Sequence, residues 1–503
     1  MKYQESPRLS IRLLSLMLLM GGLLIGALAQ GQPFWPQFRG PTGQGISESA
    51  HPPVSFSKTN ALWATEVPPG HSSPVVWGNK IFLTTQDRMS LQCRAYDRTK
   101  GERLWAKTVP AGKLEPMHPF NNAAAPSAAA DGERVIFYFG SFGLLAYTHE
   151  GAPLWEKKLP MQVSRNKYGS ASSPILCGDL VVLALDSDEG GSRLLALKRA
   201  SGEVAWETER PLFSAGWSTP VVWTKEGHSE ILLLGSKKLA AYEPGDGKEL
   251  WSVAGFTLET VPSPACDAER VYACAAGMGG RSSLHFESSF WDQLQKVEAN
   301  HDGKIQIEEV PQAFHLVQRP ELPEGHSGRL LPFDVRGILK EVDQDKDGAV
   351  TEQEWTKGTE EFEKADAPVL MALLPGSVPK NQERVAWKYG RGIPEIPSPL
   401  AYEGKLYLIR DGGRLQCMDS ATGAVLFQER IGAAGGYAAS PVAAQGRVYV
   451  ASQSGIVTVI NARAPKLEVL ARNPLEEKVT ATPALVEGRI YVRTEKHLFA
   501  FGE

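Results

Sequence analysis

The fold is decided by a repeated stretch whose clearest copy is residues 73–108, SPVVWGNKIFLTTQDRMSLQCRAYDRTKGERLWAKT. A hydroxyl residue and a proline open it, and four short β-rich segments follow, separated by turns. The prolines of such dipeptides recur at spacings of 42 to 52 residues, apart from one gap of 135 residues. A unit of this length is typical of one four-stranded propeller blade. The eight dipeptides are Ser73-Pro74, Pro126-Ser127, Ser173-Pro174, Thr219-Pro220, Ser263-Pro264, Ser398-Pro399, Ser440-Pro441 and Thr482-Pro483.

The second half of the unit carries a spaced pattern that indicates how blades pack. Ten residues separate an alanine from a tryptophan, with a glycine between them. The glycine permits a positive φ in the turn, and the tryptophan can lie against the next blade while its N–H bonds a backbone carbonyl. The three clearest copies are Ala95, Gly101 and Trp105; Ala196, Gly202 and Trp206; and Ala241, Gly247 and Trp251.

The ends of the chain predict a closed ring. Residues 61–67 form a lone outer strand ahead of the first complete unit, and residues 496–501 form a third strand with no fourth strand after it. Because one supplies what the other lacks, the N-terminal segment completes the last blade and protects a sheet edge. We therefore expect an all-β eight-bladed propeller, with seven blades as the alternative, and a small α-helical insertion.

In these repeats the chain resembles the family of eight-bladed propellers built from pyrroloquinoline-quinone-type units, whose blades bear Ala-x-Asp-x-x-x-Gly-x-x-x-Trp. The resemblance covers residues 61–277 and 367–503. It implies either a quinoprotein alcohol dehydrogenase or a cofactor-free propeller such as the lipoprotein that helps to insert outer-membrane barrels. The dehydrogenases carry two adjacent cysteines beside the quinone, whereas Cys266 and Cys274 are eight residues apart. The lipoprotein carries a lipidated cysteine, and this chain has none before Cys93.

The long gap contains a twelve-residue stretch, DQDKDGAVTEQE at 343–354, that matches an EF-hand calcium loop at every diagnostic position. The expected ligands are three aspartate carboxylates, one backbone carbonyl, one water-holding threonine and a bidentate glutamate, and Gly348 makes the sharp turn. They are Asp343, Asp345, Asp347, Ala349, Thr351 and Glu354.

A sister loop precedes it at residues 298–309, EANHDGKIQIEE. Ile305 should pair with Val350, as the eighth positions of paired EF-hand loops do. Glu298 stands where aspartate is usual, and its longer arm should weaken or reshape this site. The alternative is that both loops are acidic surface turns. The expected ligands of this loop are Glu298, Asn300, Asp302, Lys304 and Glu309.

Charge gives calcium a reason to bind the insertion. Residues 281–366 hold 19 acidic and 10 basic side chains, a net charge of −9, so the segment repels itself without a cation. The gap falls between the second and third strands of the fifth blade. The expected role is therefore a lid or docking arm on the face where the central channel opens, stiffened by a structural calcium ion.

The N-terminus predicts export. Three basic residues precede an apolar run from Leu13 to Leu28, and Ala27-Leu28-Ala29 offers a cleavage site, so residues 1–29 are interpreted as a signal peptide. Residues 30–60 are an extended segment. Without residues 1–29, 50 basic residues face 56 acidic ones, which does not favour a nucleic-acid partner. We expect a periplasmic or extracellular protein that does not span the membrane after signal removal.

The remaining domain boundaries are 61–277 for the first part of the propeller, 278–366 for the EF-hand pair and 367–503 for the second part. Residues just before each hydroxyl–proline dipeptide should line the channel mouth and bind a ligand or cofactor. The alternative is that they simply plug it. The expected function is a calcium-binding scaffold for a small ligand or an envelope protein partner, and the alternative is a quinone-dependent oxidoreductase acting on an alcohol or sugar. The channel candidates are His71, Asn121, Asn122, Tyr168, Trp217, Glu395 and Tyr437.

Overall fold

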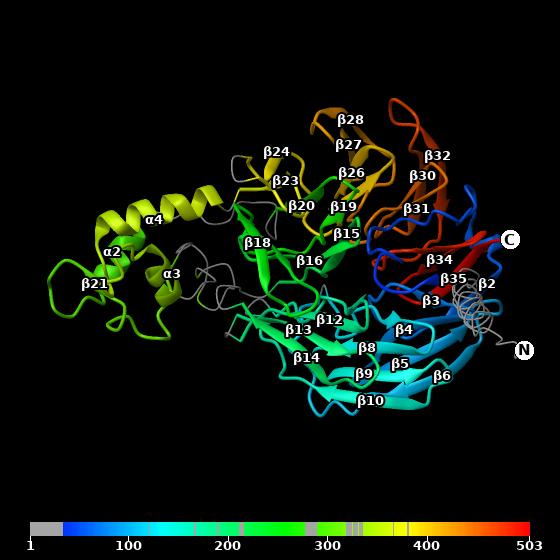
Figure 1. The fold of residues 1–503 in the computed structure, drawn as a ribbon, viewed down its shortest axis with the longest axis horizontal. Helices are drawn as coiled ribbons and strands as arrows, with labels where there is room; N and C mark the ends of the chain where they lie inside the picture. The colour runs from blue at the N-terminus through cyan, green and yellow to red at the C-terminus, as the bar shows by residue number, and fades with distance from the viewer. Residues whose placement is uncertain are drawn as a thin grey trace, which may run out of the picture.

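Eight antiparallel sheets are arranged around a central axis in a ring (Figure 1). The computed structural model describes residues 34–119, 121–164, 167–188, 191–210, 216–276, 289–317, 324, 330, 335–365, 367–379 and 382–503. The expected signal peptide lies outside these residues. Within them the protein is an all-β propeller with eight blades and three α-helices, and no helix is long and apolar enough to cross a bilayer.

Each blade is a four-stranded meander, numbered here from its inner to its outer strand. The first four blades are formed by β3 (Val75–Trp77), β4 (Lys80–Asp87), β5 (Ser90–Asp97) and β6 (Arg103–Thr108); β7 (Ala129–Ala130), β8 (Arg134–Phe139), β9 (Gly143–Thr148) and β10 (Pro153–Lys158); β11 (Ile175–Cys177), β12 (Leu180–Leu185), β13 (Arg193–Lys198) and β14 (Val204–Glu209); and β15 (Val221–Lys225), β16 (His228–Gly235), β17 (Lys238–Tyr242) and β18 (Glu249–Ala254).

The last four blades follow the same order. They are formed by β19 (Ala265–Cys266), β20 (Val271–Ala275), β23 (Val369–Leu373) and β24 (Val385–Tyr389); β25 (Leu400–Tyr402), β26 (Lys405–Arg410), β27 (Arg414–Asp419) and β28 (Val425–Arg430); β29 (Val442–Ala444), β30 (Arg447–Ala451), β31 (Ile456–Asn461) and β32 (Val469–Pro474); and β33 (Ala484–Val486), β34 (Arg489–Arg493), β35 (His497–Gly502) and β2 (Trp63–Glu66).

The two ends of the described chain meet in the eighth blade. The N-terminal strand β2 pairs antiparallel with the C-terminal strand β35, with Trp63 opposite Ala500 and Glu66 opposite His497. A short 3-10 helix, η1 (Lys58–Asn60), precedes β2. Because the outer strand comes from the other end of the chain, opening the ring requires the loss of this whole strand pair.

Tryptophan and glycine hold neighbouring blades together. The indole N–H groups of Trp105 and Trp155 each donate to a backbone carbonyl in the turn of the next blade, at 2.9 Å. The same turn contains a glycine with positive φ, and a Cβ on Gly202 would lie 2.6 Å from the ring of Trp155. Glycine is therefore required at this position for two reasons: the backbone has a positive φ, and the indole above it leaves no room for a Cβ.

The hydroxyl residues of the repeated dipeptides form a closed ring around the channel. The backbone N–H of each one donates to the side-chain hydroxyl of the next blade's member at 2.9 to 3.0 Å, and the eighth donates back to the first. We call these residues the hydroxyl ring. Each is almost fully buried. The members are Ser73, Ser127, Ser173, Thr219, Ser263, Ser398, Ser440 and Thr482.

One layer deeper, residues 34–47 thread across the channel and fill it; we call this segment the plug. Its strand β1 (Phe34–Trp35) pairs with β3, and the fully buried Arg39 donates to the carbonyl of Pro399 at 2.6 Å. Further bonds reach other inner strands: Ala130 N to Pro36 O, Leu176 N to Gln37 Oε1, Cys266 N to Gln44 Oε1 and Ala443 N to Gly45 O. The plug thus bonds to six of the eight blades.

The chain between β20 and β23 departs from the propeller and forms a helical body at the side of the ring (Figure 1). It contains α2 (Ser289–Gln295), α3 (Val335–Val342) and α4 (Glu352–Ala365), with the two-residue strands β21 (Ile305–Gln306) and β22 (Ala349–Val350) paired between them. Ile305 lies opposite Val350. Its apolar core is separate from those of the blades and includes Phe290, Leu294, Leu339 and Trp355.

Candidate functional sites

The loop at 343–354 gathers three carboxylates. Oxygen atoms of Asp343, Asp345 and Glu354 lie within 4.8 Å of one another, and among the described residues this is the one such group that could hold a metal ion. Asp343 is buried, and its Oδ1 has no hydrogen-bond partner. A buried carboxylate oxygen without a partner is costly, and a cation at the centre of the group would satisfy it.

Backbone N–H groups hold the carboxylates of this loop in place. Gly348 N donates to Asp343 Oδ2 at 3.1 Å, and Ala349 N donates to Asp347 Oδ1 at 2.8 Å. Glu354 Oε2 accepts from the backbone N–H and the hydroxyl of Thr351, at 2.9 and 2.8 Å. The bond from the Thr351 N–H is the main reason that the pKa of Glu354 is lowered, so its carboxylate stays ionised and ready for a cation.

The loop at 298–309 has the same bonding pattern. Glu298 Oε1 accepts from Gly303 N at 2.9 Å, as Asp343 accepts from Gly348, and Lys304 N donates to Asp302 Oδ1 at 2.8 Å. Glu309 Oε2 is buried without a partner. The difference lies at Asp302, whose Oδ2 already accepts hydrogen bonds from two side-chain amides, Asn300 Nδ2 and Gln306 Nε2. This loop therefore offers a cation fewer unoccupied oxygens.

One side chain joins the two loops. Lys304 Nζ lies 3.2 Å from Asp347 Oδ2, so the first loop places an ammonium group on an expected ligand of the second. Both side chains are partly exposed. A cation bound at 343–354 would therefore feel a fixed positive charge close by.

A second candidate site lies on the propeller axis, in a cavity of about 410 Å³ that we call the cup. All eight members of the hydroxyl ring line it, and Phe38 of the plug reaches it from below. Its wall comes from loops that join consecutive blades and from turns between second and third strands, which therefore share one face. The other polar and aromatic wall residues are His71, Asn121, Tyr168, Trp217, Glu395, Asp411, Gln453, Lys478 and Thr480.

Five of the seven channel candidates line the cup, and two do not. Asn122 turns its side chain to the backbone N–H of Ala124, and Tyr437 is buried with its hydroxyl donated to Ala433 O. Wall residues outside the positions before the dipeptides were not predicted from the sequence. Asp411 and Gln453 follow second strands, and a search of the turns that share this face would have found them. No motif in the sequence around Phe38 indicated that this residue lines the cavity.

Loops after the first three blades fix the geometry of one side of the cup. Asn121 Nδ2 donates to Tyr168 O at 2.5 Å, and Trp217 Nε1 donates to Gly169 O at 2.7 Å. The rings of Tyr168 and Trp217 meet edge to face, with centroids 5.7 Å apart. Burial, with the nearby Arg493, lowers the pKa of His71 to about 4, so its imidazole is neutral at pH 7.

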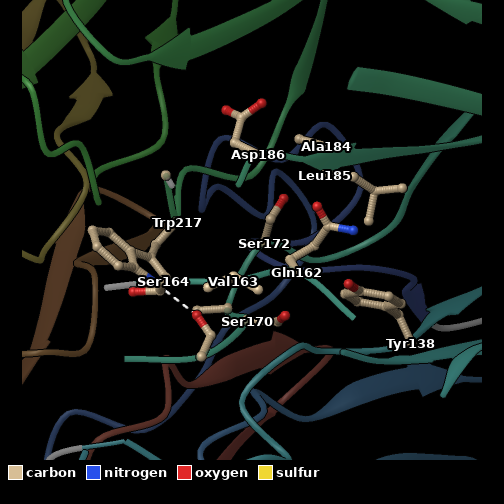
Figure 2. Close-up of a pocket in the computed structure, with 13 residues that line it drawn as sticks. Tyr138, Gln162, Val163, Ser164, Ser170, Ser172, Ala184, Leu185, Asp186 and Trp217 are labelled. Carbon is tan, nitrogen blue, oxygen red and sulfur yellow. Dashed lines mark hydrogen bonds between the residues drawn. The ribbon is translucent and has the colours of Figure 1, made fainter. Parts of the chain in front are cut away.

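A smaller pocket lies beside the cup, between the second and third blades. Figure 2 shows Ser170, Ser172, Asp186 and Tyr138 around it, with Trp217 at its side. Glu115 anchors this region, because its Oε2 accepts from both the backbone N–H and the hydroxyl of Ser170 at 2.9 Å. Its other oxygen is buried without a partner, and burial raises its pKa to about 7. The carboxyl of Glu115 thereby ties together two loops that form the wall of the cup.

The repeats and the ring identify the family. The family model described as outer membrane protein assembly factor BamB matches residues 57–185, 149–280, 336–467 and 411–501, so the chain belongs to this family. No protein with a curated description matches the sequence.

Solved structures share the fold at low identity. BamB from Moraxella catarrhalis superposes with a TM-score of 0.50 at 11% identity, covering 88% of this chain and 98% of that one. Quinohemoprotein alcohol dehydrogenase from Comamonas testosteroni gives 0.54 at 11%, covering 93% and 80%, and a europium-containing methanol dehydrogenase gives 0.51 at 12%, covering 94% and 98%. At such identities the likeness shows the fold alone.

Proposed function

We propose that the protein is an exported calcium-binding propeller that acts as a scaffold for a ligand or an envelope partner, with calcium stabilising an EF-hand pair in the fifth blade. The observation that carries the proposal is the carboxylate group of Asp343, Asp345 and Glu354, with a buried Asp343 oxygen that lacks a partner. Oxygen donors in a twelve-residue loop are what calcium prefers. Residue types, spacing and geometry therefore agree.

The role of the ion is structural. The insertion carries nine more negative than positive charges, and its two loops pair through strands of only two residues each. Calcium neutralises the carboxylates and stiffens the body around them. Outside the cytosol calcium is abundant, so a site of modest affinity stays filled.

Calorimetric titration of the mature protein with calcium tests the proposal. Glu354→Gln should lose roughly tenfold or more in affinity, because it removes the bidentate ligand. Glu352→Gln is the matched control, since it is the same change on the same helix at an exposed position that supplies no ligand. Chelation should raise hydrogen exchange in residues 289–317 and 335–365 and leave the blades unchanged. Failure of the unaltered protein to bind calcium would refute the proposal.

The partner class follows from the family. Its description names an outer membrane protein assembly factor, and a propeller exported to the envelope would meet envelope proteins through the face that carries the cup and the insertion. Cross-linking capture from envelope extracts, compared with a protein that lacks residues 289–365, would test whether the insertion contributes to docking.

A second candidate is a quinone-dependent oxidoreductase, which the shared fold and the size of the cup favour. The side chains of the cup support it less. Among the described residues, the carboxylate group suited to a cation lies in the insertion, and the five cysteines are buried, free thiols with no two adjacent in sequence. Titration with pyrroloquinoline quinone in calcium-replete buffer decides between the candidates. A shifted quinone spectrum at one equivalent would favour the enzyme.

A further inference from the structure

We propose that the hydroxyl ring is the base of a binding site for a polyhydroxylated ligand of the saccharide class. The inference deepens the proposed scaffold role of the cup and rests on it. It is carried by the eight convergent hydroxyl groups, the carboxylate acceptors of the wall and the aromatic side chains beside them.

The ring offers hydrogen-bond donors that the protein does not use. Each of its hydroxyl oxygens accepts one backbone N–H, at 2.9 to 3.0 Å. Within the described ranges, none of the eight donates its own hydrogen to a protein acceptor, whereas the neighbouring Ser72 does donate, to Thr84 O. A hydroxyl that already accepts one bond still has one proton to give. The floor of the cup can therefore present as many as eight O–H donors to a ligand rich in oxygen.

The wall adds hydrogen-bond acceptors to the donors of the ring. Among the described residues that line the cup, Glu395 and Asp411 carry carboxylates and Lys478 an ammonium group. The buried guanidinium groups of Arg39 and Arg493 donate to the carbonyls of Pro399 and Ser72, next to the ring. A saccharide hydroxyl can accept from the ring with its oxygen and donate its hydrogen to a carboxylate of the wall. Gln453 and Asn121 add amide groups that can do either.

Shape and apolar surface agree with this ligand class. The cup volume of about 410 Å³ falls in the range of small-molecule sites, roughly 300 to 1,000 Å³. Phe38 and Trp217 line the cavity, and the C–H faces of a sugar ring can pack against such aromatic side chains. Donors below, acceptors at the wall and aromatic rings beside them match a molecule that is polar at its rim and apolar on its faces.

Saturation-transfer NMR with the calcium-loaded mature protein tests the proposal. The probes are the methyl glycosides of glucose, galactose, mannose, xylose and N-acetylglucosamine, with inorganic phosphate and acetate as anions. At least one glycoside should receive saturation, and the anions should not displace it. Absence of transfer to every glycoside, in protein that still binds calcium, would overturn this inference while leaving the proposed calcium role intact.

Substitutions at Thr219 and Asp411 test which groups bind. Thr219→Val should weaken glycoside binding about three- to tenfold, the size of one lost hydrogen bond, whereas Thr219→Ser keeps the hydroxyl and should stay within about twofold. Asp411→Asn serves if the valine variant does not fold. It should weaken a glycoside, because an amide replaces a charged acceptor, but it would strengthen an anion. Glycoside binding that neither Thr219→Val nor Asp411→Asn weakens would overturn the proposal.

Discussion

The backbone N–H of Thr482 donates to the hydroxyl of Ser73 at 3.0 Å, across 409 residues of chain. This bond is the eighth in the hydroxyl ring and returns it to its first member. It lies on the channel side of the eighth blade, whereas the pairing of β2 with β35 lies on the outer side. The ring is therefore closed twice, near the axis and at the rim.

The inner closure predicts a stability effect. Ser73→Ala removes the acceptor of the Thr482 N–H and leaves that buried donor without a partner, which should lower the free energy of unfolding by about 1 to 3 kcal/mol. Ser73→Thr keeps the hydroxyl and should cost less. Urea denaturation of the two variants provides the comparison, and equal stabilities would show that the ring bond contributes nothing.

The packing of indole on glycine predicts a difference between two similar substitutions. Gly202 and Gly227 have φ of 73° and 81°, so alanine is strained at both positions by about 1 kcal/mol. A Cβ at residue 202 also meets Trp155 at 2.6 Å, whereas nothing lies within 4 Å of one at residue 227. Gly202→Ala should therefore be more destabilising than Gly227→Ala by about 1 to 3 kcal/mol in chemical denaturation. Similar losses of stability in the two variants would show that the indole of Trp155 moves aside at no cost in free energy.

Glu115 predicts a pH dependence of stability. Burial raises its pKa from 4.5 to about 7, so between these values the folded state holds a proton that the unfolded state has released. Stability contributed by this group is therefore present below pH 4.5 and is lost as pH rises to about 7, by a total on the order of 3 kcal/mol. Glu115→Gln should remove this part of the slope.

The measurement is urea unfolding of both proteins from pH 5 to pH 8. Burial also raises the pKa of Asp186, to about 6, and its contribution falls in the same direction in both proteins. The difference between the two curves isolates Glu115. Parallel curves would show that this carboxyl titrates normally.

The contact between the loops predicts a tighter calcium site when it is removed. Lys304→Gln takes away the ammonium group 3.2 Å from Asp347 Oδ2, so calcium affinity at 343–354 should rise about two- to fivefold at low ionic strength. Lys340→Gln is the control, since it removes the same charge from an exposed position on α3. The gain should shrink in high salt. An equal change in both variants would assign the effect to net charge alone.

Sequence patterns predicted the blades because each blade repeats the same order of short strands and turns. The spacing of the dipeptides gave the number eight, and the ten-residue interval from Ala196 to Trp206 indicated the contact between blades. The dipeptides predicted where inner strands begin, but the ring bonds depend on the closed geometry, which places Ser73 beside Thr482. Local periodicity contains no information on such a contact.

The cup was predicted in part for the same reason. His71 and Trp217 precede the dipeptides and line the cavity, but Tyr437, in an equivalent position, is held by Ala433 O. Phe38 reaches the cavity only because the plug threads through the ring. The loop at 343–354 was easier to single out, since its six expected ligands lie within twelve residues and each position has its own chemical requirement. Its binding of calcium stays a prediction.

The plug limits how a molecule can enter and leave the cup along the propeller axis. Residues 34–47 bond to inner strands of six blades, and Arg39 among them is completely buried. A molecule that enters the cup must therefore leave by the same mouth. A ligand bound in the cup would therefore exchange only through the opening on that face, and the loops around this opening would set its rate of dissociation.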